Sequence, residues 1–309
     1  MNTTDLKTFV TIAGCGSFSE AASLLHLTQP AISKRIASLE QSLNTLLFDR
    51  IARKIRLTEA GQILLERAQK ILLELEDTRR LITNISNHVG GELSLGISHH
   101  IGLHRLPPIL KQYTQQYPDV KLDLKFIDSE AACQAVEKNE LEIAVVTLPN
   151  QPSDSLKLLP VWQDSLAFVT APDFPLQHAT PQTLASHPAI LPAYDTYTRN
   201  ILEQQFHPFG ITLNVMLETN NLETIKMMVS IGLCWSVLPE TMLDETICVH
   251  SIKDIAMTRT LGIVHHKERT LSNAANAFIK LLGEIDHPAK AANSDVKAIR
   301  RSNPSSFLL

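Results

Sequence analysis

The sequence predicts an α/β protein with a helix-rich domain at its N-terminus. Residues 1–58 place apolar side chains at helical intervals and interrupt them with short breaks. After the HVGG segment at residues 88–91, stretches typical of strands alternate with stretches typical of helices, which indicates an α/β domain with parallel strands. The chain has 309 residues, 44% of them hydrophobic and 19% charged, the composition of a globular protein with two or three domains.

The first predicted helix covers residues 5–13, where apolar residues recur at helical spacing. Thr3 or Thr4 is expected to be its N-cap, because a side-chain hydroxyl can accept a hydrogen bond from a free backbone N–H of the first turn. Gly14 and Gly16 are expected to end it.

Two further helices are predicted with only residues 26–28 between them. Ser17 or Ser19 is expected to cap the first, and Thr28 the second. Pro30 then falls in the first turn of the second helix, where a missing N–H costs nothing. We therefore expect a tight break that sets the two helices at an angle to each other.

Residues 46–57 alternate apolar and basic residues, which predicts a small β-ribbon, or wing, with cations at its tip. A helix is then predicted over residues 59–88, with no proline and a nearly continuous apolar stripe. Because too little of the chain surrounds a helix of this length to bury the stripe, we expect a second copy of the helix to cover it. The sequence thus predicts a homodimer formed through this helix.

Charge is distributed unevenly along the chain, although the net charge is only −4. Residues 1–65 carry seven Lys and Arg against five acids, whereas residues 81–285 carry 13 against 21. Six of the seven basic residues lie between residues 34 and 56. This concentration predicts a small basic surface for a polyanion at the N-terminal end.

Residues 92–285 are predicted to alternate between strands and helices. The strands are expected at residues 92–97, 120–127, 143–147, 166–170, 213–218, 234–238 and 258–265, and the helices at residues 103–117, 129–139, 198–207, 222–231 and 271–285. The polar residues 286–309 are expected to form a loosely ordered, disordered tail.

An ordered series of short segments also marks the N-terminal region. After the pair Ala21-Ala22 come TQPAISKRIASLE at residues 28–40, LFDR at residues 47–50 and LTEAG at residues 57–61. Together they closely resemble the winged helix-turn-helix of LysR-type transcriptional regulators. The remainder resembles the effector domain of that family more loosely, through LEIAVV at residues 141–146 and GLCWSVLP at residues 232–239.

The resemblance implies a cytoplasmic, DNA-binding transcriptional regulator that responds to a small-molecule effector and is a homotetramer. It implies a winged helix-turn-helix domain at residues 1–58, a linker and dimerisation helix at residues 59–88 and an effector-binding domain at residues 89–285. That last domain would contain two periplasmic-binding-protein-like α/β subdomains joined by crossing strands. Subdomain I would cover about residues 92–160 and 263–285, and subdomain II about residues 161–262.

Polar and basic side chains on the third helix suit base and phosphate contacts in a major groove of double-stranded DNA. The expected DNA-binding residues are Gln29, Pro30, Ala31, Ser33, Lys34, Arg35, Arg50, Arg53 and Lys54. For Arg50, an ion pair within the wing is an equal alternative. A dimer of such domains would bind an inverted repeat in a promoter.

Polar residues at the predicted strand ends are candidates for effector binding, because open α/β sheets bind ligands there. The expected effector-binding residues are Ser98, His99, His100, Thr147, Tyr197, Thr198, Thr219 and Asn220. Tyr197 and Thr198 are also expected to cap the helix that carries Arg199. A capping role alone is the alternative for each of these residues.

Neither a metal nor a cofactor is expected. Neighbouring histidines such as His99 and His100 point in different directions at a strand end, and no carboxylate or cysteine stands near them at ligand spacing. Cys234 stands where the family commonly has a glycine, which raises an alternative: a redox-sensing regulator switched by cysteine oxidation. Cys234 has no Lys or Arg close in sequence to lower its thiol pKa, so a structural thiol is favoured.

Enzymes and membrane proteins are not expected. The chain has no GxSxG, HExxH, GxxxxGKS or GxGxxG segment. Its apolar runs are far shorter than the roughly 20 residues needed to span a bilayer. The first residues lack the pattern of a secretory signal, so the cytoplasm is the expected compartment.

Overall fold

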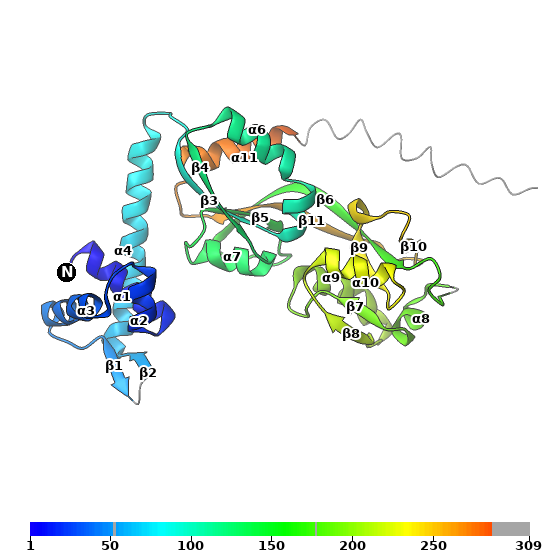
Figure 1. The fold of residues 1–309 in the computed structure, drawn as a ribbon, viewed down its shortest axis with the longest axis horizontal. Coiled ribbons are helices and arrows are strands. Elements are labelled where there is room, and N and C mark those ends of the chain that lie inside the picture. The colour runs from blue at the N-terminus through cyan, green and yellow to red at the C-terminus, as the bar shows by residue number, and fades with distance from the viewer. Residues whose placement is uncertain (52–53, 177, 286–309) are drawn as a thin grey trace, which may run out of the picture. The chain divides into compact units, whose positions relative to one another are not determined.

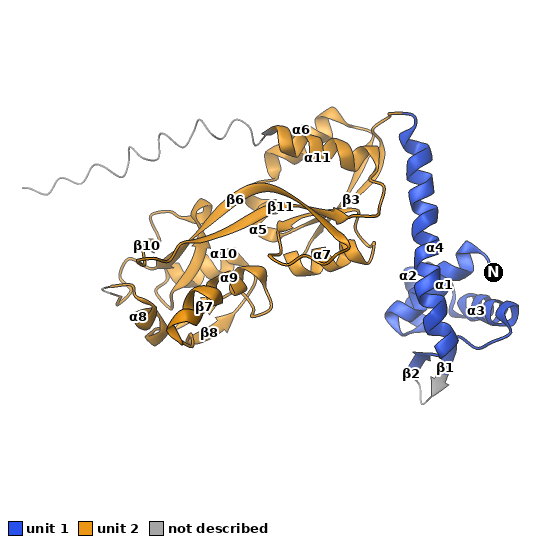
Figure 2. Ribbon diagram, turned by 180° about the vertical axis from the view of Figure 1, so that it is seen from behind, with its two compact units in different colours: residues 1–86 blue, residues 87–309 orange. Residues whose placement is uncertain are grey.

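The computed structural model describes residues 1–51, 54–176 and 178–285, and of these the side chains of residues 50, 51, 54 and 285 are left out. The chain divides into two compact units, residues 1–86 and residues 87–309 (Figure 2). The division falls just after the end of a long helix.

Unit 1 consists of short helices, an antiparallel β-ribbon and one long helix (Figure 1). Its elements are α1 (Thr3–Cys15), α2 (Phe18–Leu24), α3 (Gln29–Leu43), β1 (Phe48–Ile51), β2 (Lys54–Leu57) and α4 (Glu59–Asn84). The predicted helices and the ribbon are confirmed. Ser17 caps α2 and Thr28 caps α3, each by accepting a backbone N–H of the first turn.

The predicted cap of α1 is wrong, because the cap is Asn2 rather than Thr3 or Thr4. The Asn2 side chain accepts from the Asp5 N–H at 2.9 Å, and the Asp5 carboxylate accepts from the Asn2 N–H at 3.3 Å. This reciprocal capping box satisfies two N–H groups at once. Thr3 already belongs to the helix, which leaves the extended Asn2 as the cap residue.

The break between α2 and α3 is a Schellman turn centred on His26. The Leu27 N–H donates to the Ala22 carbonyl at 2.9 Å, and the His26 N–H donates to the Ser23 carbonyl at 3.2 Å. His26 adopts φ 53°, the left-handed region that favours glycine. The predicted tight break therefore exists, and a histidine occupies its most restricted position.

Aromatic packing joins the ribbon to the helices of unit 1. The ring centroid of Phe48 in β1 lies 5.2 Å from that of Phe9 in α1 and 5.8 Å from that of Phe18 in α2. Ile32 and Ile36 of α3 are fully buried in the same core. Since burying each such side chain contributes about 1.5–3 kcal/mol, this core fixes the orientation of α3.

Unit 2 is built on a mixed sheet (Figure 1). Its elements are β3 (Gly91–Ile97), α5 (His99–His104), α6 (Pro107–Gln116), β4 (Val120–Phe126), α7 (Ser129–Glu137), β5 (Ile143–Thr147), β6 (Leu156–Thr170), α8 (Pro181–Ser186), β7 (Ala189–Leu191), α9 (Tyr197–Phe206), η1 (His207–Phe209), β8 (Val215–Glu218), α10 (Leu222–Ser230), β9 (Ser236–Pro239), η2 (Glu240–Met242), β10 (Cys248–His250), β11 (Met257–His266) and α11 (Asn273–Ile285).

Two long strands run through both halves of unit 2. The strand order is β10-β6-β11-β5-β3-β4, with β9 also paired to β6, and β7 and β8 form a separate parallel pair. We call the part built on β3, β4 and β5 lobe I, and the part built on β7, β8 and β9 lobe II. The strands β6 and β11 belong to both lobes, and the predicted subdomain limits near residues 160 and 262 fall inside them.

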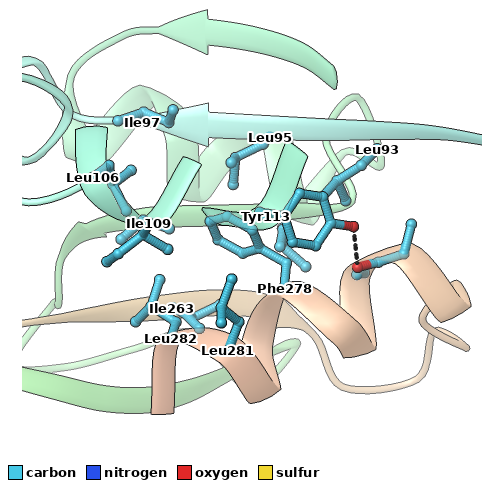
Figure 3. Packing of buried hydrophobic residues seen from close by; sticks show 14 of the residues in the cluster. Leu93, Leu95, Ile97, Leu106, Ile109, Tyr113, Ile263, Phe278, Leu281 and Leu282 are labelled. Atoms are coloured by element: carbon cyan, nitrogen blue, oxygen red, sulfur yellow. Dashed lines mark hydrogen bonds between the residues drawn. The ribbon is translucent and has the colours of Figure 1, made fainter. Parts of the chain in front are cut away.

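The core of lobe I lies between its sheet and the helices α6 and α11 (Figure 3). Tyr113 of α6 and Phe278 of α11 pack edge to face with ring centroids 5.2 Å apart. The buried Tyr113 hydroxyl donates to the Ala274 carbonyl at 2.8 Å, which satisfies its polar end. The C-terminal helix is thereby fixed to the first helices of the unit.

Several predictions for unit 2 are wrong in detail. The helix expected at residues 103–117 is two helices, α5 and α6, because Pro107 and Pro108 occupy the first positions of α6 and cannot continue a preceding helix. The strand expected at residues 166–170 already begins at Leu156, and Pro160 is accommodated where the pairing with β11 shifts register.

The elements α8, β7 and β10 were not predicted. The pairings of β6, β9, β10 and β11 are antiparallel, so the expectation of parallel strands holds for β3, β4, β5, β7 and β8 alone.

In the part of the chain that the structure describes, no helix combines the length and the apolar character needed to cross a membrane. The expected tail, residues 286–309, lies outside the described residues.

The left-handed conformation of His26 predicts that His26→Gly stabilises unit 1. Relieving the steric cost of a side chain at this φ is expected to raise the free energy of unfolding by about 1 kcal/mol. Native-state hydrogen exchange of the α2 and α3 amides in the full chain measures the change. The control Ser23→Gly, at an exposed right-handed position of α2, is expected to lower it by about 0.5 kcal/mol. If His26→Gly lowers the protection of these amides from exchange as much as the control does, the left-handed conformation of His26 is contradicted.

Candidate functional site

In unit 1, the candidate DNA-binding side chains of α3 lie away from the buried stripe. Gln29, Pro30 and Lys34 are exposed, and Ala31, Ser33 and Arg35 are half-buried. Gln29 begins the helix, and its Oε1 accepts from the Ser19 hydroxyl of α2 at 3.3 Å. The first turn of α3 therefore presents an amide that the preceding helix already orients.

The wing is held at its base by Glu40 of α3. The Glu40 carboxylate accepts the Leu47 N–H at 2.8 Å and the Phe48 N–H at 3.4 Å. Along the ribbon, Arg50 pairs with Ile55 and Ile51 with Lys54 in the backbone register. The predicted contact residue Arg53 lies outside the described residues, as do the side chains of Arg50 and Lys54.

In unit 2, polar residues from both lobes line one cleft. The lining residues are Ser98, His99, His100, Asp128, Ser129, Glu130, Thr147, Pro192, Thr196, Thr198, Asn220, Leu222 and Arg259. They come from the ends of β3, β4 and β5 in lobe I, from the starts of α9 and α10 in lobe II and from the crossing strand β11. The cleft therefore lies where a ligand would contact both lobes.

The structure places six of the predicted effector residues in this cleft: Ser98, His99, His100, Thr147, Thr198 and Asn220. Two others do not line it. Tyr197 donates its backbone N–H to Glu130, and the Thr219 hydroxyl accepts the Asn221 N–H at 3.3 Å. The predicted caps of α9 are also wrong, because Thr196 is its N-cap and accepts the Arg199 N–H at 3.2 Å.

The remaining lining residues were missed by the sequence reasoning. Asp128 and Ser129 follow the predicted end of β4, so the strand-end argument applied to Ser98 could have found them. Arg259 is the third residue of β11, where a sequence pattern gives no sign that the strand faces a cleft. Thr196 directly precedes the predicted Tyr197, and Leu222 follows Asn220 by two positions. Glu130 and Pro192 are the other two lining residues that were not predicted.

Two hydrogen bonds cross the cleft from lobe I to lobe II. The Glu130 carboxylate accepts the Tyr197 N–H at 2.6 Å, and the Asp128 carboxylate accepts from the Asn220 amide at 2.8 Å. Burial raises the pKa of Glu130, with the nearby Asp128 and Asp195 adding to the shift and the Tyr197 N–H opposing it. The carboxylates of Glu130 and Asp128 thus already bridge the two lobes.

A buried charge cluster includes Arg259 and Asp164, and Arg259 also lines the cleft. Asp164 of β6 accepts from Arg259 Nε at 2.8 Å and from Arg105 Nη2 at 3.2 Å. Arg259 Nη1 donates to the Thr198 hydroxyl of α9 at 3.0 Å. Burial lowers the pKa of His100 to about 3, with the positive charge of Arg259 adding to the shift, so this imidazole is neutral.

Two of the cysteines are poorly suited to oxidation. Cys234 is fully buried, and burial raises the pKa of its thiol to about 11. Cys133 is buried against Tyr197, and its pKa is likewise raised to about 11. Since the thiolate is the reactive form, these environments favour structural thiols over redox sensors. Within the described ranges, no group of three His, Cys, Asp or Glu is arranged to hold a metal ion.

Comparison with known proteins identifies both units. Residues 3–62 match the model of the bacterial regulatory helix-turn-helix proteins of the lysR family, and residues 86–285 match that of the LysR substrate binding domain. The chain belongs to the LysR family of transcriptional regulators. The resemblance seen in the sequence is confirmed.

Individual relatives agree with this LysR-type assignment. An HTH-type transcriptional regulator of Azotobacter vinelandii, from its ibpB-leuC intergenic region, is 60% identical over 108 residues, 35% of this chain and 75% of that protein. The HTH-type transcriptional regulator YwqM of Bacillus subtilis is 31% identical over 289 residues, 91% of this chain and 98% of that protein. Full-length OxyR of Pseudomonas aeruginosa, solved as a variant, has a similar fold with a TM-score of 0.66 at 24% identity, covering 92% of this chain and 94% of that one.

The protein is thus a LysR-type DNA-binding transcriptional regulator with an effector-binding domain. The helix-turn-helix of unit 1 is the DNA-binding part, and unit 2 contains the substrate binding domain. The cleft between the lobes lies within that second domain.

Burial predicts that the four thiols react in two groups. In the native full-length protein, Cys15 and Cys248, both half-buried, are expected to react with a disulfide reagent at least about tenfold faster than Cys133 and Cys234, whose thiolates are suppressed. Timed labelling followed by peptide mass spectrometry measures each rate. Denatured protein, in which all four react alike, is the control. Rapid native labelling of Cys234 would support the redox alternative instead.

Proposed function

We propose that this LysR-type regulator binds a promoter inverted repeat through α3 and the wing, and that a small-molecule effector binding between the lobes modulates that interaction. The effector part is supported by one observation: a single cleft is lined by polar residues from both lobes and from a strand that joins them. A ligand bound in this cleft would change the contacts between the two lobes. Such a change in domain arrangement can shift how the protein assembles and binds DNA.

The DNA part rests on how α3 is presented. Its N-terminus carries the exposed Gln29 and Pro30, and Lys34 follows one turn later. A glutamine amide can form two hydrogen bonds with an adenine edge. A lysine can instead contribute its charge to phosphates, a contact that carries no sequence information. We therefore assign sequence reading to Gln29 and Ser33, and phosphate binding to Lys34, Arg35 and the basic residues of the wing.

This division predicts different effects for two substitutions. Lys34→Ala is expected to weaken binding to all DNA sequences and to reduce the slope of log affinity against log salt by about 1. Gln29→Ala is expected to cost about 1–3 kcal/mol on the operator only, which relaxes specificity. Gel-shift titrations of the fragment upstream of its own gene, at several salt concentrations, measure both. The control is Lys111→Ala, at an exposed position on α6 of unit 2. If this control loses as much DNA affinity as Lys34→Ala, the assignment of phosphate binding to Lys34 is refuted.

We infer that α4 forms a homodimer and that two dimers form a homotetramer. Large apolar side chains of α4 and of its C-cap residue are exposed in the single chain, namely Ile63, Ile71, Leu81 and Ile82 in the helix and Ile85 directly after it. At about 100° per residue they fall within one arc of roughly 100° of the helix surface. An apolar arc of this kind needs a cover, and a second α4 of the same sequence provides one.

The dimer predicts that Ile82→Glu dissociates the protein. Ile82 is 65% exposed in the single chain, so a glutamate is tolerated there in a monomer but opposes an apolar interface. Light scattering coupled to size-exclusion chromatography is expected to show half or less of the molar mass of the unsubstituted protein. Circular dichroism is expected to show unchanged helicity. The exposed Gln69→Glu, which adds the same charge on the opposite face of α4, is the control and should leave the mass unchanged. Dissociation of the control as well would point to charge rather than the apolar arc.

We infer further that the protein acts by binding rather than by catalysis, and that it does so in the cytoplasm. Membership of a family of transcriptional regulators supports both statements. The test is a gel shift of the same upstream fragment with and without the small-molecule fraction of a cell extract. A change in affinity that an Arg259 variant abolishes is expected. No retardation of the fragment at low salt would refute DNA regulation at that locus.

A further inference from the structure

The charged groups of the cleft fall into a basic set and an acidic set, which we call the basic end and the acidic end. The basic end consists of Arg259 and His100, backed by Asp164 and Arg105, and the acidic end consists of Asp128 and Glu130. A ligand held by both ends must carry complementary groups.

The basic end has buried hydrogen-bond donors and an excess positive charge. Asp164 is one carboxylate shared by two guanidinium groups, so the formal charge of the cluster is +1. Arg259 is 5% exposed, and its Nη2, although 2.8 Å from Asp164 Oδ2, lacks hydrogen-bond geometry with any described residue.

His100 adds to the unmet hydrogen-bonding capacity of the basic end. It is 7% exposed, and both of its ring nitrogens are buried without a hydrogen-bond partner in the part of the chain that the structure describes. A buried polar atom without a hydrogen-bond partner destabilises the folded protein. A ligand that supplies the missing partner removes this free-energy cost, so these atoms favour binding of such a ligand in the cleft. A carboxylate matches both a guanidinium and an imidazole N–H.

The acidic end has negative charges that meet only neutral donors. Glu130 accepts from a backbone N–H and Asp128 from an amide, and within the described residues neither forms an ion pair with Lys or Arg. The carboxylate of Asp195 adds to this charge. A carboxylate has about four acceptor positions, so both side chains can accept further hydrogen bonds. An ammonium group supplies such donors together with the missing positive charge.

We propose that the cleft binds a small α-amino acid, with its carboxylate at Arg259 and His100 and its ammonium group at Asp128 and Glu130. A zwitterion pairs with both ends and adds no net charge to a partly buried site. Pro192 and Leu222 give the cleft apolar surface suited to a short alkyl side chain. The proposal rests on the proposed function, because it takes the effector site to be this cleft.

Four compounds with the same five-carbon chain test the class of ligand. They are L-norvaline, (S)-2-hydroxypentanoate, pentanoate and 2-aminopentane, each titrated calorimetrically into the full-length protein. L-Norvaline is expected to bind at least about tenfold more tightly than the other three, since each of them lacks one charged pairing. Equal or tighter binding of pentanoate or of 2-aminopentane would overturn the proposal, as would no binding of any of the four.

Conservative variants then locate the two ends. Asp128→Asn with Glu130→Gln keeps acceptors for the Asn220 amide and the Tyr197 N–H but removes both charges. The affinity for L-norvaline is expected to fall about tenfold, while that for (S)-2-hydroxypentanoate changes less than about twofold. Glu140→Gln, an exposed acid just after α7, is the matched control. An equal loss for both ligands would mean that the pair only supports the fold.

At the basic end, Arg259→Lys retains the charge but not the planar fork and is expected to weaken every carboxylate ligand about tenfold. Thr198→Val is the milder variant should Arg259→Lys fail to fold, because it removes only the hydroxyl that Arg259 contacts. If Arg259→Lys folds, an unchanged affinity for L-norvaline would overturn this placement of the carboxylate. If it does not fold, an unchanged affinity in Thr198→Val would do the same.

The DNA assay separates the two hypotheses. If none of the four compounds binds, but the small-molecule fraction of a cell extract still changes DNA affinity, the ligand class is wrong and the proposed function stands. If that fraction has no effect either, the proposed effector response fails as well.

Discussion

The pairing of β6 with β11 is the constraint on which unit 2 depends. These antiparallel strands pass through both lobes, and through them β5 of lobe I and β9 of lobe II become part of one sheet. Asp164 of β6 and Arg259 of β11 stand directly opposite each other in this pairing and are almost completely buried. Since a buried charge requires a partner, the register of the strands and the ion pair reinforce each other.

The same ion pair connects the scaffold with the cleft. Arg259 reaches Thr198 at the start of α9, while Arg105 approaches Asp164 from the end of α5. Residues of both lobes are thus tied to one carboxylate on a crossing strand. A change in the hydrogen bonding of Arg259 acts on the strands that connect the lobes, which is a direct physical route from cleft to lobe arrangement.

The sequence predicted those parts of the fold that depend on local patterns. The capped helices of unit 1, the ribbon and most strands of unit 2 follow from periodicity, caps and turn residues, and the strand-end argument selected Ser98, Thr147 and Asn220, which line the cleft. It failed where distant segments decide the outcome. The length of β6 depends on β11, nearly 100 residues later, and Pro160 obscured it. Arg259 becomes a cleft residue only through that pairing.

The two hydrogen bonds across the cleft also affect the strength of any ligand. Glu130 and Asp128 already accept from backbone and amide donors of lobe II, so a ligand either uses their remaining acceptor positions or displaces these contacts. A molecule that displaces either contact must first supply the free energy that the contact provides, and its apparent affinity is reduced by the fraction of molecules in which the contact is closed. For a ligand of this kind, weaker contacts between the lobes would lower the concentration at which it binds.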